Sequence, residues 1–183
     1  MAQTNMVEWA TQQAAEFLTP LGNRWLHTQG VVKKAYQIAD MFKEEDRSIL
    51  IAAAYVHDIG YAPSLTSTGF HPQDGAYYLL SQNQRRLASL VAYHSGAKFE
   101  AQLRRLASDL NQFPEEHSAV ADALTYCDML TGPTGLEISF KERIMDILQR
   151  YDEKEIVNRA IHQAIPSLEF IMERTRSLIH QTI

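Results

Sequence analysis

Apolar residues recur at helical spacing along this 183-residue chain, most densely between residues 50 and 60. That segment reads L-I-A-A-A-Y-V-H-D-I-G and carries His57 and Asp58 near its end. His57 continues an apolar stripe with Leu50, Ala53 and Ala54, and Asp58 continues a second stripe with Ile51 and Tyr55. A helix that is apolar on most sides is buried on most sides, and a buried carboxylate needs a positive partner or strong donors. The pattern therefore predicts a buried helix, ended by Gly60, that carries both polar residues into the core.

The same spacing predicts helices along most of the remaining chain, with loops where Gly, Pro, Ser and Thr cluster. Expected helices cover about residues 4–18, 23–43, 72–80, 84–95, 98–110, 115–130, 139–151, 152–164 and 166–181, with loops over 61–70 and 131–135 and a polar turn at 44–46. Ser139 with Glu142, and Asp152 with Glu155, have the spacing of a capping box. Pro166 is expected to kink or restart the last helix. Because no strand pattern is evident, we expect an all-α, compact, single-domain bundle of eight to nine helices over residues 1–183.

Side chains of the kind that bind metals lie on several of these apolar stripes. They are His27, His57 with Asp58, His94 and Asp128, and His71 lies at a loop-to-helix junction. Each residue alone has an ordinary interpretation as a hydrogen-bonded core residue, a helix start or a cap. As a group, histidines and carboxylates drawn inward from separate helices must pair with one another or coordinate a cation. Imidazole with carboxylate is a normal ligand set for zinc, iron or manganese, and a helical bundle can gather such ligands from distant positions.

Composition narrows the classes of partner and compartment. The formal net charge is −5 and the pI about 5.8, which argues against a nucleic-acid polymer or an anionic membrane as partner. The single cysteine, Cys127, excludes an internal disulfide, and no arrangement in the sequence activates it as a nucleophile. Neither a signal peptide nor an apolar run of about 20 residues is found, so we expect a soluble, cytoplasmic protein. The sequence leaves the oligomeric state open.

The ordered set of ligand-type residues resembles the HD superfamily of metal-dependent phosphohydrolases. His27, the pair His57-Asp58 and then Asp128 match its pattern, and H-D-I-G at residues 57–60 is a common form within it. The segments H-P-Q-D-G-A from His71 and Y-H-S-G-A from Tyr93 are similar to those that carry two further histidine ligands in its two-metal branches. The motifs lie within a core of about residues 24–130. Helices expected over residues 137–181 would pack on that core, and no recognised motif covers them.

The resemblance implies a dinuclear site in which water or hydroxide between the metals is the nucleophile. His27, His57, Asp58 and Asp128 would hold one divalent ion, and Asp58 would bridge to a second ion held by His71 and His94. One or two ions are implied, with Fe, Mn, Zn, Mg and Ni all left open, and His57 and Asp58 are the implied catalytic residues. Arg24, one turn before His27, and Lys98, four residues after His94, are candidate phosphate binders, although ordinary solvated charges are an equally good interpretation. Tyr61 and the loops over 64–70 and 131–135 would line the mouth.

The implied function is hydrolysis of a phosphoester or phosphoanhydride in a small metabolite or nucleotide. Two alternatives remain: a mixed-valent di-iron oxygenase using the same six ligands, and a non-catalytic nucleotide-binding module. The chain lacks the Glu-Asp pair that follows the His-Asp pair in alarmone hydrolases, since Ile59-Gly60 stands there. It also lacks the Gly-Tyr-Pro segment of cyclic-dinucleotide phosphodiesterases, so both of these substrate classes are disfavoured.

Overall fold

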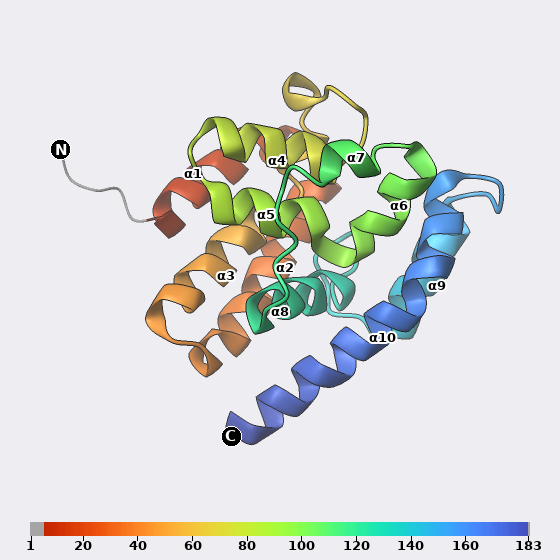
Figure 1. The fold of residues 1–183 in the computed structure, drawn as a ribbon. Coiled ribbons are helices and arrows are strands. Elements are labelled where there is room, and N and C mark those ends of the chain that lie inside the picture. Colours follow the sequence, from red (N-terminus) through yellow and green to blue (C-terminus); the bar gives the residue numbers. More distant parts are fainter. Residues whose placement is uncertain (1–5, 183) are drawn as a thin grey trace.

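Helices make up the regular structure of the computed structural model, which describes residues 6–182 (Figure 1). The α-helices are α1 (Met6–Leu18), α2 (Asn23–Ile38), α3 (Glu44–Val56), α4 (His71–Ser81), α5 (Arg85–Tyr93), α6 (Ala97–Arg104), α7 (Ala107–Leu110), α8 (Ala119–Met129), α9 (Phe140–Arg150) and α10 (Ile156–Thr182). Of these, α7 has four residues and the other nine have eight or more. The described chain has no strand beyond an isolated bridge between Thr131 and Glu137. The all-α prediction is therefore confirmed.

In the first half of the chain, several predicted helix ends were wrong. Residues 4 and 5 of the first predicted helix lie outside the described residues. The second ends at Ile38 and passes into a 3₁₀ turn, Ala39–Met41, before residue 43. The acidic residues expected in a turn, 44–46, instead form the first turn of α3, where they complement the helix dipole. α3 ends at Val56, so His57 and Asp58 lie just after the helix.

The second half of the chain differs from expectation at several places. Arg105 adopts a left-handed conformation with φ 62° and divides the predicted helix 98–110 into α6 and α7. α8 begins at Ala119, later than predicted, because Ser118 caps it by accepting a hydrogen bond from the Ala121 backbone N–H. The capping box at Ser139 is confirmed, whereas Asp152 opens no helix, because α10 begins at Ile156. α10 continues through Pro166, which lies at an exposed position of the helix.

α3 lies at the centre of the bundle and packs against α1, α2, α5 and α8. Its residues Ala52, Ala53 and Ala54 are fully buried, and such small side chains allow neighbouring helices to approach closely. A second apolar cluster joins α8, α9 and α10 and includes Met129, Ile147 and Leu168. Figure 1 shows α10 crossing the bundle beside α8 and α9 with its C-terminal half extending past them. None of the described helices is long and apolar enough to cross a membrane.

Two backbone contacts through glycine fix the loops that flank the centre of the bundle. A Cβ on Gly60 would lie 2.0 Å from the His71 carbonyl oxygen, so only glycine lets the 3₁₀ turn Ile59–Tyr61 meet the start of α4. A Cβ on Gly30 in α2 would lie 2.4 Å from the Gly135 carbonyl oxygen. The loop after α8 therefore rests directly on the α2 backbone.

Candidate metal centre

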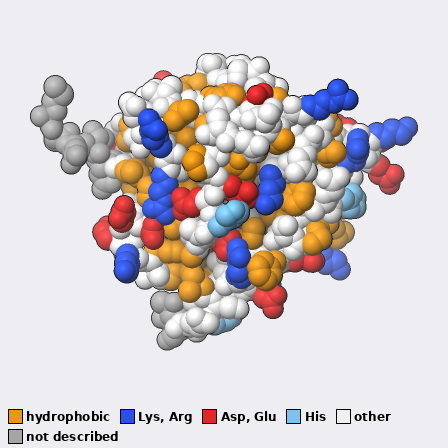
Figure 2. Space-filling view, in the orientation of Figure 1, with side chains coloured by type: hydrophobic (Ala, Val, Ile, Leu, Met, Phe, Trp, Pro, Cys, Tyr) orange, Lys and Arg blue, Asp and Glu red, His pale blue; other side chains and the backbone are white. Residues whose placement is uncertain are grey.

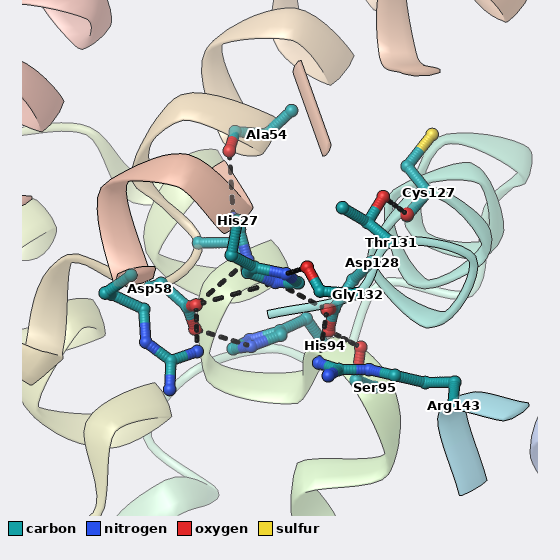
Figure 3. Close-up of polar contacts among 12 residues, drawn as sticks. His27, Ala54, Asp58, His94, Ser95, Cys127, Asp128, Thr131, Gly132 and Arg143 are labelled. Atoms are coloured by element: carbon teal, nitrogen blue, oxygen red, sulfur yellow. Dashed lines mark hydrogen bonds and ion pairs between the residues drawn. The ribbon is translucent and has the colours of Figure 1, made fainter. Parts of the chain in front are cut away.

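The six predicted ligands converge at the centre of the bundle. His27 comes from α2, His57 and Asp58 follow α3, His71 begins α4, His94 follows α5 and Asp128 lies in α8. Their donor atoms form two trios, His27–His57–Asp128 and Asp58–His71–His94, in each of which the atoms lie within 4.8 Å of one another. Figure 3 shows His27, Asp58, His94 and Asp128 pointing toward one another. The fold therefore brings together side chains that are separated by up to 101 residues.

Asp58 lies between the two trios and directs one carboxylate oxygen to each. Its Oδ2 atom is 3.3 Å from His57 Nε2 and 3.8 Å from His27 Nε2. Its Oδ1 atom is 3.4 Å from His71 Nε2 and 3.9 Å from His94 Nε2. This is the position that a carboxylate bridging two cations would take.

Backbone carbonyls set the orientation of three histidine rings. Nδ1 lies 3.1 Å from the Gly132 carbonyl in His27, 2.9 Å from the Ala54 carbonyl in His57 and 2.6 Å from the Val91 carbonyl in His94. A carbonyl only accepts hydrogen bonds, so each Nδ1 carries the proton and donates it. In the neutral rings the Nε2 lone pair therefore faces the centre, and metal-binding histidines are oriented in the same way.

These lone pairs make the centre a site for positive charge. Nε2 of His57 lies 3.4 Å from Nε2 of His27, and both atoms face the Asp58 and Asp128 carboxylates. Burial would lower the pKa of His57, but the Asp58 carboxylate outweighs burial and raises it. Burial keeps the pKa of His71 and His94 below the ordinary value, so both rings stay neutral and able to donate a lone pair. The donor set and its electrostatics thus fit a divalent metal.

Both carboxylates are held in the ionised form. Burial would raise the pKa of Asp58, but Arg24, which donates to its Oδ2 at 2.7 Å, and His57 hold that pKa well below its usual range. Burial would raise the pKa of Asp128 as well, but His27, whose Nε2 lies 3.0 Å from Oδ1, and Arg143 together hold that pKa well below its usual range. Asp128 also accepts hydrogen bonds from Arg143, at 3.3 Å, and from the Ser95 hydroxyl (Figure 3). Ionised carboxylates are the form that binds metal ions.

Two of the three predicted substrate-binding residues lie beside this centre. The Arg24 guanidinium lies 3.9 Å from the centroid of the Tyr61 ring, and Tyr61 stacks on His71 with ring centroids 3.9 Å apart. The structure does not bring Lys98 to the same place. Its ammonium group forms an ion pair with Glu115 at 2.9 Å and lines a separate groove along α8 and α10. Gly96 and its left-handed φ of 78° turn the chain between His94 and Lys98, so helical spacing does not relate them.

A cavity of about 240 Å³ opens above the donors. Its floor includes Asp58, His71, His94 and Asp128. Residues 66–70 border it near Gly69, and Asp74 holds this loop by accepting four hydrogen bonds from Ser67, Thr68 and Gly69. These hydrogen bonds give the first of the two loops predicted at the mouth a fixed shape. The second predicted loop, residues 131–135, contributes no residue to the lining of the cavity.

Sequence reasoning missed the contribution of Ser95 and of the C-terminal helices. Ser95 lies in the Y-H-S-G-A segment and has φ 51°, a costly conformation for serine that places its hydroxyl on Asp128. Arg143 comes from α9, a region without a recognised motif, so only the folded structure connects it to Asp128. α9 and α10 supply one side of the cavity.

The remaining candidates stay outside the centre. Cys127 is fully buried, and burial raises the pKa of its thiol, in agreement with a structural role. Two histidines outside the six predicted ligands, His117 and His162, are exposed. Figure 2 shows acidic and basic side chains interspersed on one face of the molecule.

Comparison with known proteins gave one match. The family model described as HD domain matches residues 24–154, from the start of α2 to just past α9. No curated protein and no solved structure matches the chain.

Proposed function

Because the chain belongs to the HD domain family, we propose that it is a metal-dependent phosphohydrolase that acts on a small phosphorylated metabolite or nucleotide. The observation that carries this proposal is the pair of donor trios joined by Asp58 at the floor of a cavity. Phosphoryl transfer needs positive charge around the phosphate and little covalent chemistry from the protein. Two trios of ionised carboxylates and neutral imidazoles, with arginines beside them, meet that need.

In this proposal His27, His57 and Asp128 hold one divalent cation, His71 and His94 hold a second, and Asp58 serves both. When bound, the cations lower the pKa of water toward neutrality and offset the charge of the phosphoryl group. Burial of the His27–His57–Asp128 trio excludes other water from that side of the centre, since these residues are each at most 5% exposed. Backbone carbonyls keep the histidine rings aimed at the centre, so little reorganisation is needed on binding.

Arg24 has a further role in this proposal. Its guanidinium has five N–H donors, and the Asp58 carboxylate takes one at 2.7 Å. Stacking on Tyr61 fixes its plane at the edge of the cavity, where it can donate to phosphate oxygens. The phosphorus–oxygen ester bond breaks as water adds to phosphorus, and the leaving oxygen takes a proton.

The test is metal analysis of the protein as purified, followed by a phosphatase screen over nucleotides and sugar phosphates. We expect about two equivalents of metal and release of phosphate without oxygen. Asp58→Ala should lose metal and turnover while keeping the fold, because alanine suits the buried position and the Arg24 side chain, 26% exposed, can turn its charge to solvent. Asp109→Ala, at an exposed position of α7, is the matched control.

Two results would contradict the proposal. Full metal content and turnover in Asp58→Ala would exclude this site. Uptake of oxygen by an iron-loaded enzyme, without release of phosphate from the esters, would support the di-iron oxygenase alternative instead.

A further inference from the structure

The cavity above the donors is small. Its volume of about 240 Å³ lies below the range of roughly 300–1,000 Å³ that ligand pockets usually have. A phosphate group with a few further heavy atoms suits such a space better than a nucleoside with its phosphates. Size alone therefore favours a short phosphoester.

The side of the cavity formed by α10 is apolar. Its lining residues are Val157, Ala160, Ile161 and Ala164, whose side chains carry no hydrogen-bonding group. From Ala160 onward the backbone N–H and C=O groups of α10 are paired with one another, because only the first turn of a helix, here Ile156 to Arg159, leaves its N–H groups without an intrahelical partner. A ribose hydroxyl or a base edge placed against this side would lose its bonds to water and gain none, which costs about 1–3 kcal/mol for each unpaired group. An alkyl group placed there would gain by leaving water.

α9 supplies both charge and apolar surface to the same cavity. Arg143, Ile147 and Arg150 lie at i, i+4 and i+7, so one face of this helix lines the cavity. The Arg143 side chain is 9% exposed and contacts Asp128 at the floor, while Arg150, 39% exposed, lies toward solvent. Asp146 accepts hydrogen bonds from both arginines, at 3.3 Å and 2.8 Å, and so holds their orientation.

Arg143 has hydrogen-bonding capacity to spare. Its Nε atom is buried and has no hydrogen-bond partner among the described residues. A buried donor without a partner is costly, and a small shift of the guanidinium toward an anion in the cavity would satisfy it. Because Arg143 contacts Asp128, its guanidinium group lies beside the two trios of candidate metal ligands.

From this arrangement we propose that the substrate is a small phosphomonoester with a short apolar remainder. Its phosphate lies at the floor beside Arg143, and its remainder lies between Ile147 and Ile161. This proposal rests on the proposed phosphohydrolase function and narrows it to one substrate class. The products are inorganic phosphate and a short apolar alcohol.

The test compares three esters with the wild-type protein as purified: propyl phosphate, glycerol 3-phosphate and AMP. Propyl phosphate and glycerol 3-phosphate have the same carbon chain and differ by two hydroxyl groups. We expect kcat/KM for propyl phosphate to be at least about tenfold higher than for either other ester, because the apolar side leaves hydroxyl groups unpaired. An equal or higher value for glycerol 3-phosphate or AMP would overturn the proposal.

Two variants test the residues named. Ile161→Ser should lower kcat/KM for propyl phosphate at least about tenfold and change that for glycerol 3-phosphate by less than about threefold. Ile171→Ser, the same change in α10 at a residue outside the cavity lining, is the matched control and should keep the wild-type ratio. Arg143→Lys should raise KM for both esters alike, since lysine keeps the charge and loses the planar fork. An unchanged ratio in Ile161→Ser, with the fold verified by circular dichroism, would contradict the proposed apolar contact.

Calorimetric binding separates this proposal from the function on which it rests. If none of the esters is hydrolysed, the phosphohydrolase function fails, but the cavity can still be tested with propyl phosphate and glycerol 3-phosphate as ligands. Binding of propyl phosphate at least about tenfold tighter would support the apolar side. Equal binding, or none, would overturn it.

Discussion

Gly30→Ala tests how far the centre depends on one contact between backbones. A Cβ at residue 30 would lie 2.4 Å from the Gly135 carbonyl oxygen and 2.7 Å from the Gly135 Cα atom. Ordinary contact begins at 3.4 Å, so the loop after α8 has to move away from α2 by about 1 Å. The Gly132 carbonyl accepts hydrogen bonds from the Gly135 N–H, at 3.0 Å, and from His27 Nδ1–H, at 3.1 Å. Displacing Gly135 therefore also disturbs the group that orients His27.

The free energy of unfolding should fall by about 1–3 kcal/mol. Overpacking costs about 1–3 kcal/mol, and the weakened His27 hydrogen bond costs about 1 kcal/mol more. Alanine in a helix gains about 1 kcal/mol over glycine, which offsets the hydrogen-bond loss. If the site binds metal, its affinity should also fall about 10- to 100-fold, as is usual when a histidine ligand loses its orienting partner.

Urea unfolding followed by circular dichroism measures the stability change, and competition with a chelator measures metal affinity. Gln29→Ala, at the adjacent exposed position of α2, is the control and should change stability by less than about 0.5 kcal/mol. The reasoning is wrong if Gly30→Ala is as stable as this control, because the close contact would then carry no strain.

Three further predictions concern other parts of the structure. His71→Ala and His94→Ala should each lower kcat at least about a hundredfold, or roughly 2.7 kcal/mol of barrier, and remove about one equivalent of metal; near-wild-type turnover with one ion would exclude the two-metal interpretation. Asp74→Asn turns an amide NH₂ toward the Gly69 N–H in place of an accepting oxygen, and thermal unfolding should show a loss of about 1–3 kcal/mol. Burial would raise the pKa of Glu116, but hydrogen bonds from Arg86 and Ser118 lower it in the folded protein. The stability that Glu116 contributes is therefore full above its ordinary pKa of 4.5 and is lost as pH falls through the lowered folded-state pKa. The stability difference between wild type and Glu116→Gln, measured by urea unfolding across pH, should therefore shrink in acid, and a constant difference would refute the ion pair.

The candidate metal ligands could be predicted from the sequence because the pattern that identifies each of them involves only nearby residues. His27, His94 and Asp128 continue apolar helical stripes, and a polar residue on such a stripe points inward wherever the helix packs. The prediction for His57 and Asp58 placed them correctly in the core even though the helix, which was expected to continue to Gly60, ends at Val56. Helical spacing still placed both residues correctly, because the chain passes from α3 directly into the 3₁₀ turn Ile59–Tyr61 and does not become extended between them.

The side of the cavity that α9 and α10 form could not be predicted, because it depends on how these helices pack in the folded chain. Nothing near Arg143 in the sequence indicates that it contacts Asp128, and that contact exists only because α9 joins α8 and α10 in the second apolar cluster. The spacing from His94 to Lys98 was misleading because two left-handed residues, Ser95 and Gly96, lie between them. Pro166 was expected to interrupt α10, but buried Ala164 and Leu168 hold the helix against the bundle on both sides of it.

The unequal burial of the two trios has a kinetic consequence for any ion that they bind. His27 and His57 are 2% and 0% exposed and are not among the residues that line the cavity, whereas the His71 side chain lines it and is 20% exposed. An ion at His71 and His94 can leave through the cavity. An ion at His27 and His57 can leave only by passing the position of the first ion, or after local opening of the bundle. The two positions should therefore exchange at different rates, with the outer ion turning over first and the inner one retained through dialysis. Isotope exchange would then show two phases from a single folded protein, and a substrate in the cavity would slow both.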